Sequence, residues 1–376
     1  MNFPALTSRI IDNLRFPLIL CVVLIHCCFF NFDNLSSSQA DILEILMRVI
    51  FYESVRCAVP LFFIISGYLY FKNIGSFTVE KYLKKLKSRF RSLIIPYFIW
   101  NTITFIIIKW RVIVFFDSSL HDVWDLIQFT YLGVYYTEAN NAVSVLFVPI
   151  DFPLWFLRDL IILVILSPVI YFMAKYIRKF VLIILSICFL MDYWPSVLFF
   201  NLHGILFFTL GAWLSIKKID PSRFMIKHKK LTIFLCWLYP VVVIWDVVSY
   251  RLYPDINSIF HTFQILLSVY AIYAYFLFYS LKNTDYRSNI SGGLVFAIYV
   301  MHALVLGAIN NPVFMKKFIA SLNISSVCAN LVFSFIIYMT VLGVCFVGYR
   351  ILKNISPDLS NILFGERSVP PVFRLR

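Results

Sequence analysis

Residues 12–26 read Asp12-Asn13-Leu14-Arg15-Phe16-Pro17-Leu18-Ile19-Leu20-Cys21-Val22-Val23-Leu24-Ile25-His26, and this stretch decides the fold class of the chain. The run between Arg15 and His26 carries no charge, which is typical of a helix that crosses a lipid bilayer. On a helix the two side chains project from one face, and His26 lies about 16 Å deeper than Arg15. With Arg15 at the water boundary, His26 lies near the middle of a hydrocarbon layer about 30 Å thick. A titratable side chain at that depth is costly and indicates a function.

The composition of the whole chain indicates a polytopic membrane protein. Of its 376 residues, 61% are hydrophobic and only 14% are charged, and the mean hydropathy is +0.85. A soluble globular protein of this length cannot cover so much apolar surface, so that class is excluded. The net charge of +14 falls in short loops between apolar runs, so we interpret it as a topology signal and not as a nucleic-acid surface. The eight cysteines show no CxxC or metal-ligand spacing, and no bound metal is expected.

Ten apolar runs have spanning length, at residues 14–32, 52–71, 93–116, 154–174, 179–195, 197–216, 231–249, 259–281, 291–310 and 327–350. The fifth and sixth are joined so closely at Trp194-Pro195 that we expect a hairpin. Most of the 33 Lys and Arg residues fall on one side of this alternation, which places both termini in the cytoplasm. We therefore predict an all-α membrane protein with about ten transmembrane helices. Residues 1–352 form its membrane domain, and residues 353–376 form a short cytoplasmic tail.

Two segments on the predicted cytoplasmic side carry candidate functional residues. The segment from Val59 to Tyr68 contains Pro60, Ser66 and Gly67, which allow either a packing kink or a close approach of another backbone. The basic loop that follows carries Arg89 and Arg91 nearest the membrane. These arginines anchor the topology, and they are also suited to hold phosphates by two-pronged hydrogen bonds.

Two more segments carry candidate functional residues. One lies at the outer end of the fourth predicted span, and the other lies inside the ninth. Trp155 and Arg158 lie at the outer end of the fourth predicted span, where Trp155 is either an aromatic-belt residue or a platform for a sugar ring. We expect Arg158 and Asp159 to pair with neighbouring helices. His302, three residues after Tyr299, lies near the middle of the ninth predicted span, and it is either a packing residue or part of the site.

Taken in order, these motifs resemble the acyltransferase-3 family of membrane enzymes. The resemblance rests on Arg15 with His26, on Phe62 to Tyr68, on Arg89 and Arg91 before Pro96-Tyr97, on Trp155 to Leu157, and on Tyr299 to His302. It covers nearly the whole chain. One departure is that many members place two arginines three positions apart in the cytoplasmic loop, whereas Arg89 and Arg91 are two apart. We also expect no fused esterase-like domain of the kind found in some members.

The resemblance implies transfer of an acyl group, most often acetyl, to a cell-surface or lipid-linked saccharide by a multi-pass protein of the bacterial inner membrane. Acyl-coenzyme A is the implied co-substrate, with no permanently bound cofactor. Its flexible arm is comparable in length with the ~16 Å between Arg15 and His26. We therefore expect Arg15, Arg89 and Arg91 to hold its phosphates, and Asp12 to orient Arg15. His26 then acts as general base or accepts the acyl group covalently.

Two other classes of protein remain alternatives. A transporter or flippase of lipid-linked saccharides would explain Asp192, Asp246 and Asp255, although the chain shows no paired half-helices and no chain of intramembrane carboxylates. A glycan polymerase can also combine many spans with a large external loop, here about residues 117–153. Acceptor identity, the acyl group, and the oligomeric state are not encoded in any residue pattern.

Overall fold

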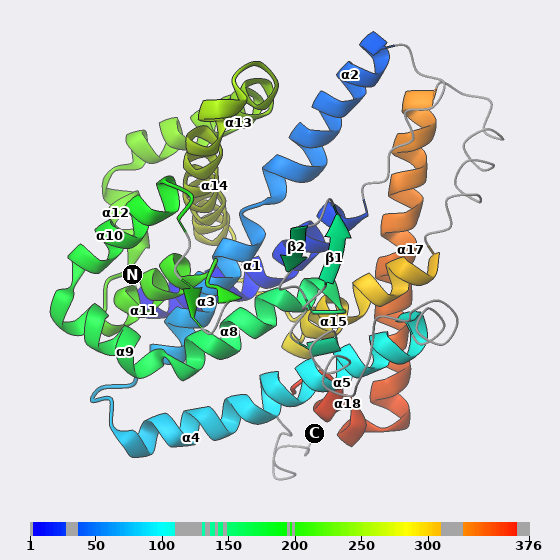
Figure 1. Cartoon of the computed structure of the whole chain (residues 1–376). Helices are drawn as coiled ribbons and strands as arrows, with labels where there is room; N and C mark the ends of the chain where they lie inside the picture. Colours follow the sequence, from blue (N-terminus) through cyan, green and yellow to red (C-terminus); the bar gives the residue numbers. More distant parts are fainter. Residues whose placement is uncertain are drawn as a thin grey trace. The chain divides into compact units, whose positions relative to one another are not determined.

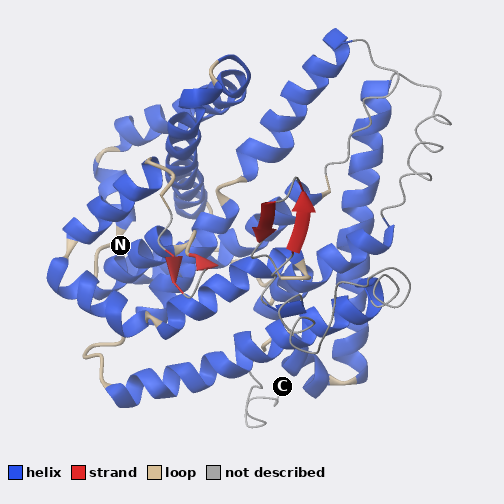
Figure 2. Ribbon diagram, in the orientation of Figure 1, coloured by secondary structure: helices blue, strands red, loops and turns tan. Residues whose placement is uncertain are grey.

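The computed structural model describes residues 3–27, 37–109, 130–131, 136–139, 142–145, 149–193, 196–197, 200–309 and 326–366. The described chain is predominantly helical, which confirms the predicted all-α class (Figure 1). Two short antiparallel pairs are the exceptions, β1 (Tyr136–Ala139) with β2 (Ala142–Val145), and β3 (Ser196–Val197) with β4 (Phe200–Asn201), drawn in red in Figure 2. The pair β3–β4 lies at the start of the sixth apolar run, residues 197–216, where we expected a helix.

The described chain forms two compact units. Unit 1 comprises Met1–Thr78, Ile165–Ile290 and Lys316–Ile336, and unit 2 comprises Val79–Val164, Ser291–Met315 and Ile337–Arg376. The α-helices of unit 1 are α1 (Phe3–His26), α2 (Ser37–Met47), α3 (Ala58–Phe71), α9 (Ser167–Phe172), α10 (Lys179–Leu190), α11 (Ile205–Ile216), α12 (Pro221–Lys227), α13 (Lys229–Leu252) and α14 (Pro254–Lys282). Those of unit 2 are α4 (Val79–Arg89), α5 (Ile95–Thr104), α8 (Trp155–Ile165), α15 (Gly292–Ile309) and α18 (Pro357–Leu363), while α17 (Ser326–Ile355) runs through both.

Unit 1 is built around the close packing of α3 on α11. A Cβ atom added to Gly67 of α3 would collide with the backbone oxygen of Phe208, and one added to Gly211 of α11 would collide with that of Ile64. Only glycine permits such a contact, because the two backbones approach without a side chain between them. The sequence allowed either a packing kink or a close approach of another backbone at this segment. At Gly67 the structure shows the close approach.

The segment before α3 is not a regular helix. A π-helical turn (Arg48–Tyr52), a 3₁₀ turn (Glu53–Val55) and a turn at Arg56-Cys57 separate α2 from α3. The broken stretch is held by contacts from α13 and α14. Tyr239 of α13 donates to the carbonyl of Ser54, and Gln264 of α14 donates to that of Glu53. These bonds satisfy backbone oxygens that a continuous helix would have paired internally.

Unit 2 joins α5, α17 and α18 at their ends. Trp100 of α5 donates its indole N–H to the carbonyl of Leu363 at 3.0 Å. Beyond α18, Glu366 accepts hydrogen bonds from Tyr349 and Lys353 of α17 at 2.6 and 3.1 Å. Lys353, Leu363 and Glu366, which make these contacts, belong to the predicted tail of residues 353–376.

By length and composition, the described residues contain six helices able to cross a membrane. They are Asp41–Phe71, Val79–Ile107, Lys229–Tyr250, Ile259–Lys282, Gly292–Ile309 and Cys328–Ile355. A seventh arises if Phe152–Ile165 and Ser167–Ile177, bent by 65°, form one broken span. The helices Lys179–Leu190 and Ile205–Ile216 are apolar but shorter. A total of ten spans with cytoplasmic termini therefore stays a prediction.

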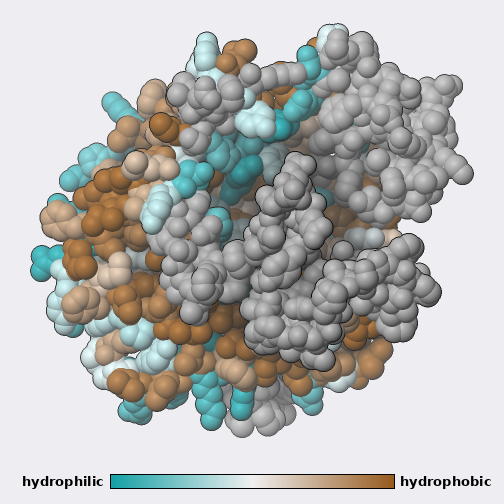
Figure 3. Space-filling view, viewed as in Figure 1, coloured by the Kyte–Doolittle hydropathy of each residue, from teal (hydrophilic) through white to brown (hydrophobic). Residues whose placement is uncertain are grey.

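Hydrophobic residues gather on the outer surface where Figure 1 places α9 and α10, at the left of the view in Figure 3. Phe172, Phe180, Ile184 and Met191 are all more than half exposed there. Exposed aliphatic and aromatic side chains along successive helices are what contact with lipid requires. The outer surface therefore supports a membrane protein.

Candidate functional site

The helix α1 carries three of the predicted site residues in unit 1. Arg15 and Asp12 form an ion pair with Nη1 and Oδ1 3.6 Å apart, and both side chains are partly exposed. His26, also partly exposed, is the last residue of α1. The expected span at 14–32 differs from the helix at its start, because α1 runs from Phe3 to His26. Residues 28–32 of that span lie outside the described residues.

Asp12 has a second and closer partner, which lies far from it in the sequence. Its Oδ2 accepts from Arg287, with Nη2 at 2.6 Å and Nε at 2.8 Å. Asn13 accepts from the backbone N–H of Ser288 at 2.8 Å. The segment after α14 is thereby fastened to α1 beside Arg15, and the arrangement holds a cluster of cationic and anionic side chains near the middle of α1.

Ser66 and Tyr68 lie on α3, which packs against α1 and α11 within unit 1. Both are partly exposed, on either side of the buried Gly67. The buried hydroxyl nearby belongs to Tyr70, whose Oη lies 2.9 Å from Ser167 Oγ. The structure thus makes Tyr70 a packing residue and leaves Ser66 and Tyr68 on less buried faces of α3.

Unit 2 carries the two predicted arginines of the basic segment. Arg89 is the last residue of α4 and is half-buried, whereas Arg91 is exposed and lies in a π-helical turn (Phe90–Ile94) that leads into α5. Tyr97, at the Pro96-Tyr97 motif, is buried and donates to the carbonyl of Tyr131 at 2.6 Å. Residues two positions apart on a helix project about 200° apart, so the two arginines differ in exposure.

Arg158 and Asp159 form a buried ion pair within α8. Arg158 donates to Asp159 Oδ1 from Nη2 at 2.8 Å and from Nε at 3.1 Å, and Asp159 is fully buried. Two opposite charges removed together from water are tolerated because each is paired and hydrogen-bonded. We expected these residues to pair with neighbouring helices; the bonds described here join them to each other. Trp155 begins the same helix and is half-buried.

Tyr299 of α15 lies against the start of α8. Its hydroxyl donates to the carbonyl of Pro153 at 2.6 Å, and its ring meets Phe156 edge to face at 5.8 Å. His302, one turn later, is fully buried, and its Nδ1 lies 2.7 Å from the carbonyl of Tyr299 and 3.1 Å from that of Ile298. A carbonyl cannot donate, so Nδ1 carries a proton, and in the neutral imidazole Nε2 then carries the lone pair. His302 is thus held in the tautomer that presents a basic nitrogen.

Asp151, just before the 3₁₀ turn Phe152–Leu154, belongs to the same part of unit 2. Its backbone N–H donates to Asn101 at 3.2 Å, and its carboxyl accepts from Thr104 at 3.3 Å. Burial raises the pKa of this carboxyl to about 7. From the sequence, residues 117–153 are expected to form a large external loop, and only the contacts with α5 reveal that Asp151 is buried.

The predicted site residues therefore fall into two groups. Unit 1 contains Asp12, Arg15, His26, Ser66 and Tyr68, and unit 2 contains Arg89, Arg91, Trp155, Arg158, Tyr299 and His302. A third group, Glu53, Asp246 and His261 of unit 1, was not predicted at all. A signal for it existed in Asp246, a carboxylate inside an apolar run, but its partners are about 190 positions earlier and 15 positions later.

Comparisons with known proteins support the resemblance that the motifs indicated. A family model described as an acyltransferase domain matches residues 9–350. The chain is also 28% identical over 187 residues to the succinoglycan biosynthesis protein ExoH of Rhizobium meliloti (strain 1021). That alignment covers 46% of this chain and 45% of the relative, so the chain matches less than half the length of that protein. No solved structure matches the chain.

Proposed function

Because this chain belongs to the acyltransferase family whose model matches residues 9–350, we propose that it moves an acyl group from acyl-coenzyme A to a hydroxyl of a cell-surface or lipid-linked saccharide. Acetyl is the acyl group proposed. The relative named for succinoglycan biosynthesis supports a polysaccharide acceptor. The apolar helices support a multi-pass location, for which we propose the bacterial inner membrane.

The observation that carries the proposal is that one uninterrupted helix, α1, holds Arg15 and His26. The helical rise separates them by about 16 Å along the axis. A coenzyme bound by its phosphates at Arg15 can therefore extend its arm along α1 and bring its thioester to His26. In this proposal Arg89 and Arg91 supply further guanidinium donors for the phosphates.

In the proposed reaction the saccharide hydroxyl attacks the thioester carbonyl. His26 takes the hydroxyl proton as general base, the new C–O bond forms, and the C–S bond breaks. The leaving thiolate of coenzyme A then takes the proton from His26. The covalent variant, in which His26 first carries the acyl group, uses the same residue and the same donor.

The residues of unit 2 take supporting roles in this proposal. Trp155 offers an aromatic face to a sugar ring, and the buried pair Arg158–Asp159 keeps two opposite charges matched within α8. Tyr299 fixes α15 to the same segment through Pro153. Ser66 and Tyr68 offer hydroxyl groups on α3, the helix that packs against α1 in unit 1. Asp12 orients Arg15.

The proposal is tested with two membrane preparations, one that contains the wild-type protein and one that contains an equal amount of His26→Ala. Each is supplied with radiolabelled acetyl-coenzyme A and a surface-glycan acceptor. We expect transfer by the wild type and none by the variant. Full activity of His26→Ala would overturn the mechanism. Mass analysis of the glycan from a deletion strain is the test in cells, where loss of acetyl groups is expected. The transporter alternative predicts saccharide movement that continues without acyl donor, and the family match argues against it.

A further inference from the structure

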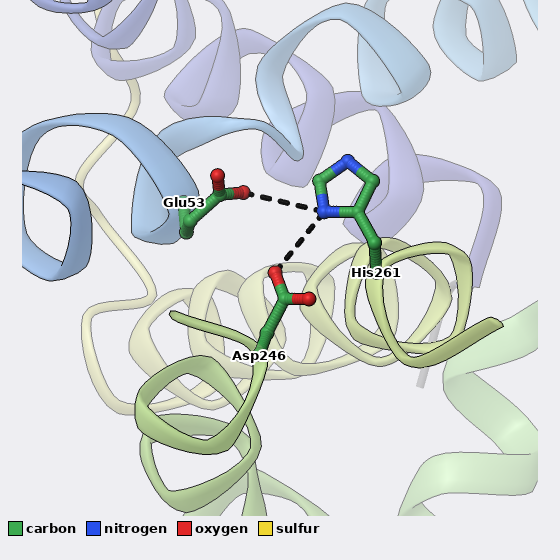
Figure 4. Close-up of side chains that lie close together, drawn as sticks. All are labelled: Glu53, Asp246 and His261. Carbon is green, nitrogen blue, oxygen red and sulfur yellow. Dashed lines mark hydrogen bonds and ion pairs between the residues drawn. The ribbon is translucent and has the colours of Figure 1, made fainter. Parts of the chain in front are cut away.

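Three side chains from three separate segments of unit 1 meet at the break between α2 and α3 (Figure 4). Glu53 comes from the 3₁₀ turn, Asp246 from α13 and His261 from α14. His261 Nδ1 lies 3.0 Å from Asp246 Oδ2 and 3.5 Å from Glu53 Oε2. All three potential ligand atoms are within 4.8 Å of one another. Two carboxylates and an imidazole thus point toward one position.

The two carboxylates of this cluster are almost fully removed from solvent. Glu53 is 5% exposed and Asp246 is 2% exposed. Asp246 Oδ1 has no hydrogen-bond partner among the described residues, and neither has Oε1 of Gln264, a fully buried neighbour whose amide N–H₂ group binds the Glu53 backbone. Buried acceptors without donors cost free energy, and a cation removes that cost.

The backbone around Glu53 is also arranged for this cluster. A π-helical turn directly followed by a 3₁₀ turn re-aims successive side chains, and such turns concentrate at functional positions. The bonds from Tyr239 and Gln264 to the carbonyls of Ser54 and Glu53 keep the helix broken here. The break therefore directs the Glu53 carboxylate toward α13 and α14.

Arg56 is the cation that faces the cluster in this structure. Its Nε lies 2.8 Å from Glu53 Oε2, and its Nη1 lies 3.1 Å from His261 Nε2. A guanidinium can only donate, so His261 Nε2 accepts and the imidazole proton is on Nδ1, facing Asp246. The Arg56 side chain is 32% exposed and stacks over the Tyr52 ring, so it is much less enclosed than the two carboxylates that it faces.

We propose that Glu53, Asp246 and His261 bind a divalent transition-metal ion, and that Arg56 competes with it for the same carboxylates. On binding, the lone pair of Nδ1 goes to the metal, the imidazole proton moves to Nε2, and Arg56 leaves. Ligand atoms about 2.0–2.2 Å from a metal ion lie roughly 3–4 Å apart, and the two distances from His261 Nδ1, 3.0 Å to Asp246 and 3.5 Å to Glu53, fall in that range. An imidazole with two carboxylates favours Zn²⁺ or Mn²⁺ over Mg²⁺ or Ca²⁺, which prefer oxygen ligands alone.

The test uses the full-length protein, purified in detergent, stripped with a chelator and titrated with ZnCl₂ or MnCl₂ by calorimetry. Metal retained after desalting is measured by elemental analysis. We expect one equivalent per wild-type chain. His261→Gln and Asp246→Asn each lose a ligand, and we expect binding at least on the order of tenfold weaker.

Two further variants make the test specific. Glu44→Gln removes an exposed acid of α2 that pairs with Arg48, and it should bind metal as the wild type does. Arg56→Gln removes the competing charge and should bind metal on the order of tenfold more tightly. This gain cannot arise from misfolding. A wild-type protein that retains no more metal than His261→Gln, or an Arg56→Gln variant that binds no more tightly than the wild type, would overturn the proposal. Neither result depends on acyl transfer.

Discussion

Asp12 lies closer to Arg287 than to Arg15, since its Oδ2 is 2.6 Å from Arg287 Nη2 and its Oδ1 is 3.6 Å from Arg15 Nη1. The carboxylate thus bridges two cations, one on α1 and one on the segment after α14. In the proposed mechanism Arg15 is a ligand for phosphate, and Asp12 restricts its position.

Asp12→Asn should therefore weaken the binding of acyl-coenzyme A without affecting the chemical step. Because partly exposed ion pairs contribute about 0.2–1 kcal/mol, we expect KM for the donor to rise by no more than about fivefold, with kcat unchanged. Steady-state kinetics in membranes measure both. Arg287→Ala is the matched control, since it removes the other partner of Asp12 and leaves Arg15 present. A loss of kcat in Asp12→Asn as large as that in His26→Ala would contradict a positioning role.

His302 should contribute to stability through its bonds to the carbonyls of α15. The side chain is fully buried, and its Nδ1 lies 2.7 Å from the Tyr299 carbonyl. His302→Ala leaves a cavity and removes the donor, and we expect a loss of about 2–4 kcal/mol in stability. His302→Asn keeps a hydrogen-bond donor on a shorter side chain, so it should recover part of the lost stability.

Thermal unfolding in detergent measures both variants, and the transfer assay separates stability from chemistry. An Asn variant as stable as the wild type but inactive would assign the basic Nε2 of His302 to the reaction instead.

Asp151 should make the stability of unit 2 depend on pH. Burial raises the pKa of its carboxyl from 3.8 to about 7, so the folded protein prefers the protonated form. The stabilisation from proton binding is complete below pH 3.8 and is lost as the pH rises toward about 7, since the unfolded chain then gives up its proton first. The difference amounts to a few kcal/mol.

The variant Asp151→Asn tests this dependence. Its amide oxygen can still accept the hydrogen bond from Thr104, but the side chain cannot ionise. We expect its unfolding temperature to exceed that of the wild type at pH 8 and to approach it at pH 5. Equal pH dependence in the two proteins would show that other groups control it.

Gly67→Ala should disrupt unit 1, because its Cβ meets the backbone oxygen of Phe208, which cannot rotate away. Overpacking of this kind costs about 1–3 kcal/mol, and the unfolding temperature should fall. Gly343→Ala in α17 is the control, since a Cβ there meets nothing within 4 Å. Alanine is the better helix former, so this change should be neutral or slightly stabilising. A Gly67→Ala protein as stable as Gly343→Ala would contradict the α3–α11 contact.

The positions of the long helices could be predicted from the sequence because hydropathy is a local property. The runs at 231–249, 259–281 and 327–350 fall inside α13, α14 and α17. The order of short motifs likewise indicated the family that the comparison confirms. The break at residues 48–57 could not be predicted, because its apolar side chains also suit a continuous helix. The break depends on hydrogen bonds from Tyr239 of α13 and Gln264 of α14 to the backbone of this segment.

By itself, the sequence determined an all-helical membrane protein and the placement of Arg15 and His26 on one helix, because both depend on residues close together in the chain. Only the tertiary structure decided which polar groups meet. It brings Arg287 to Asp12, and it brings Asp246 and His261 to Glu53. The physical reason is that a buried charge needs a partner, and helix packing supplies that partner from a segment that can be hundreds of positions away.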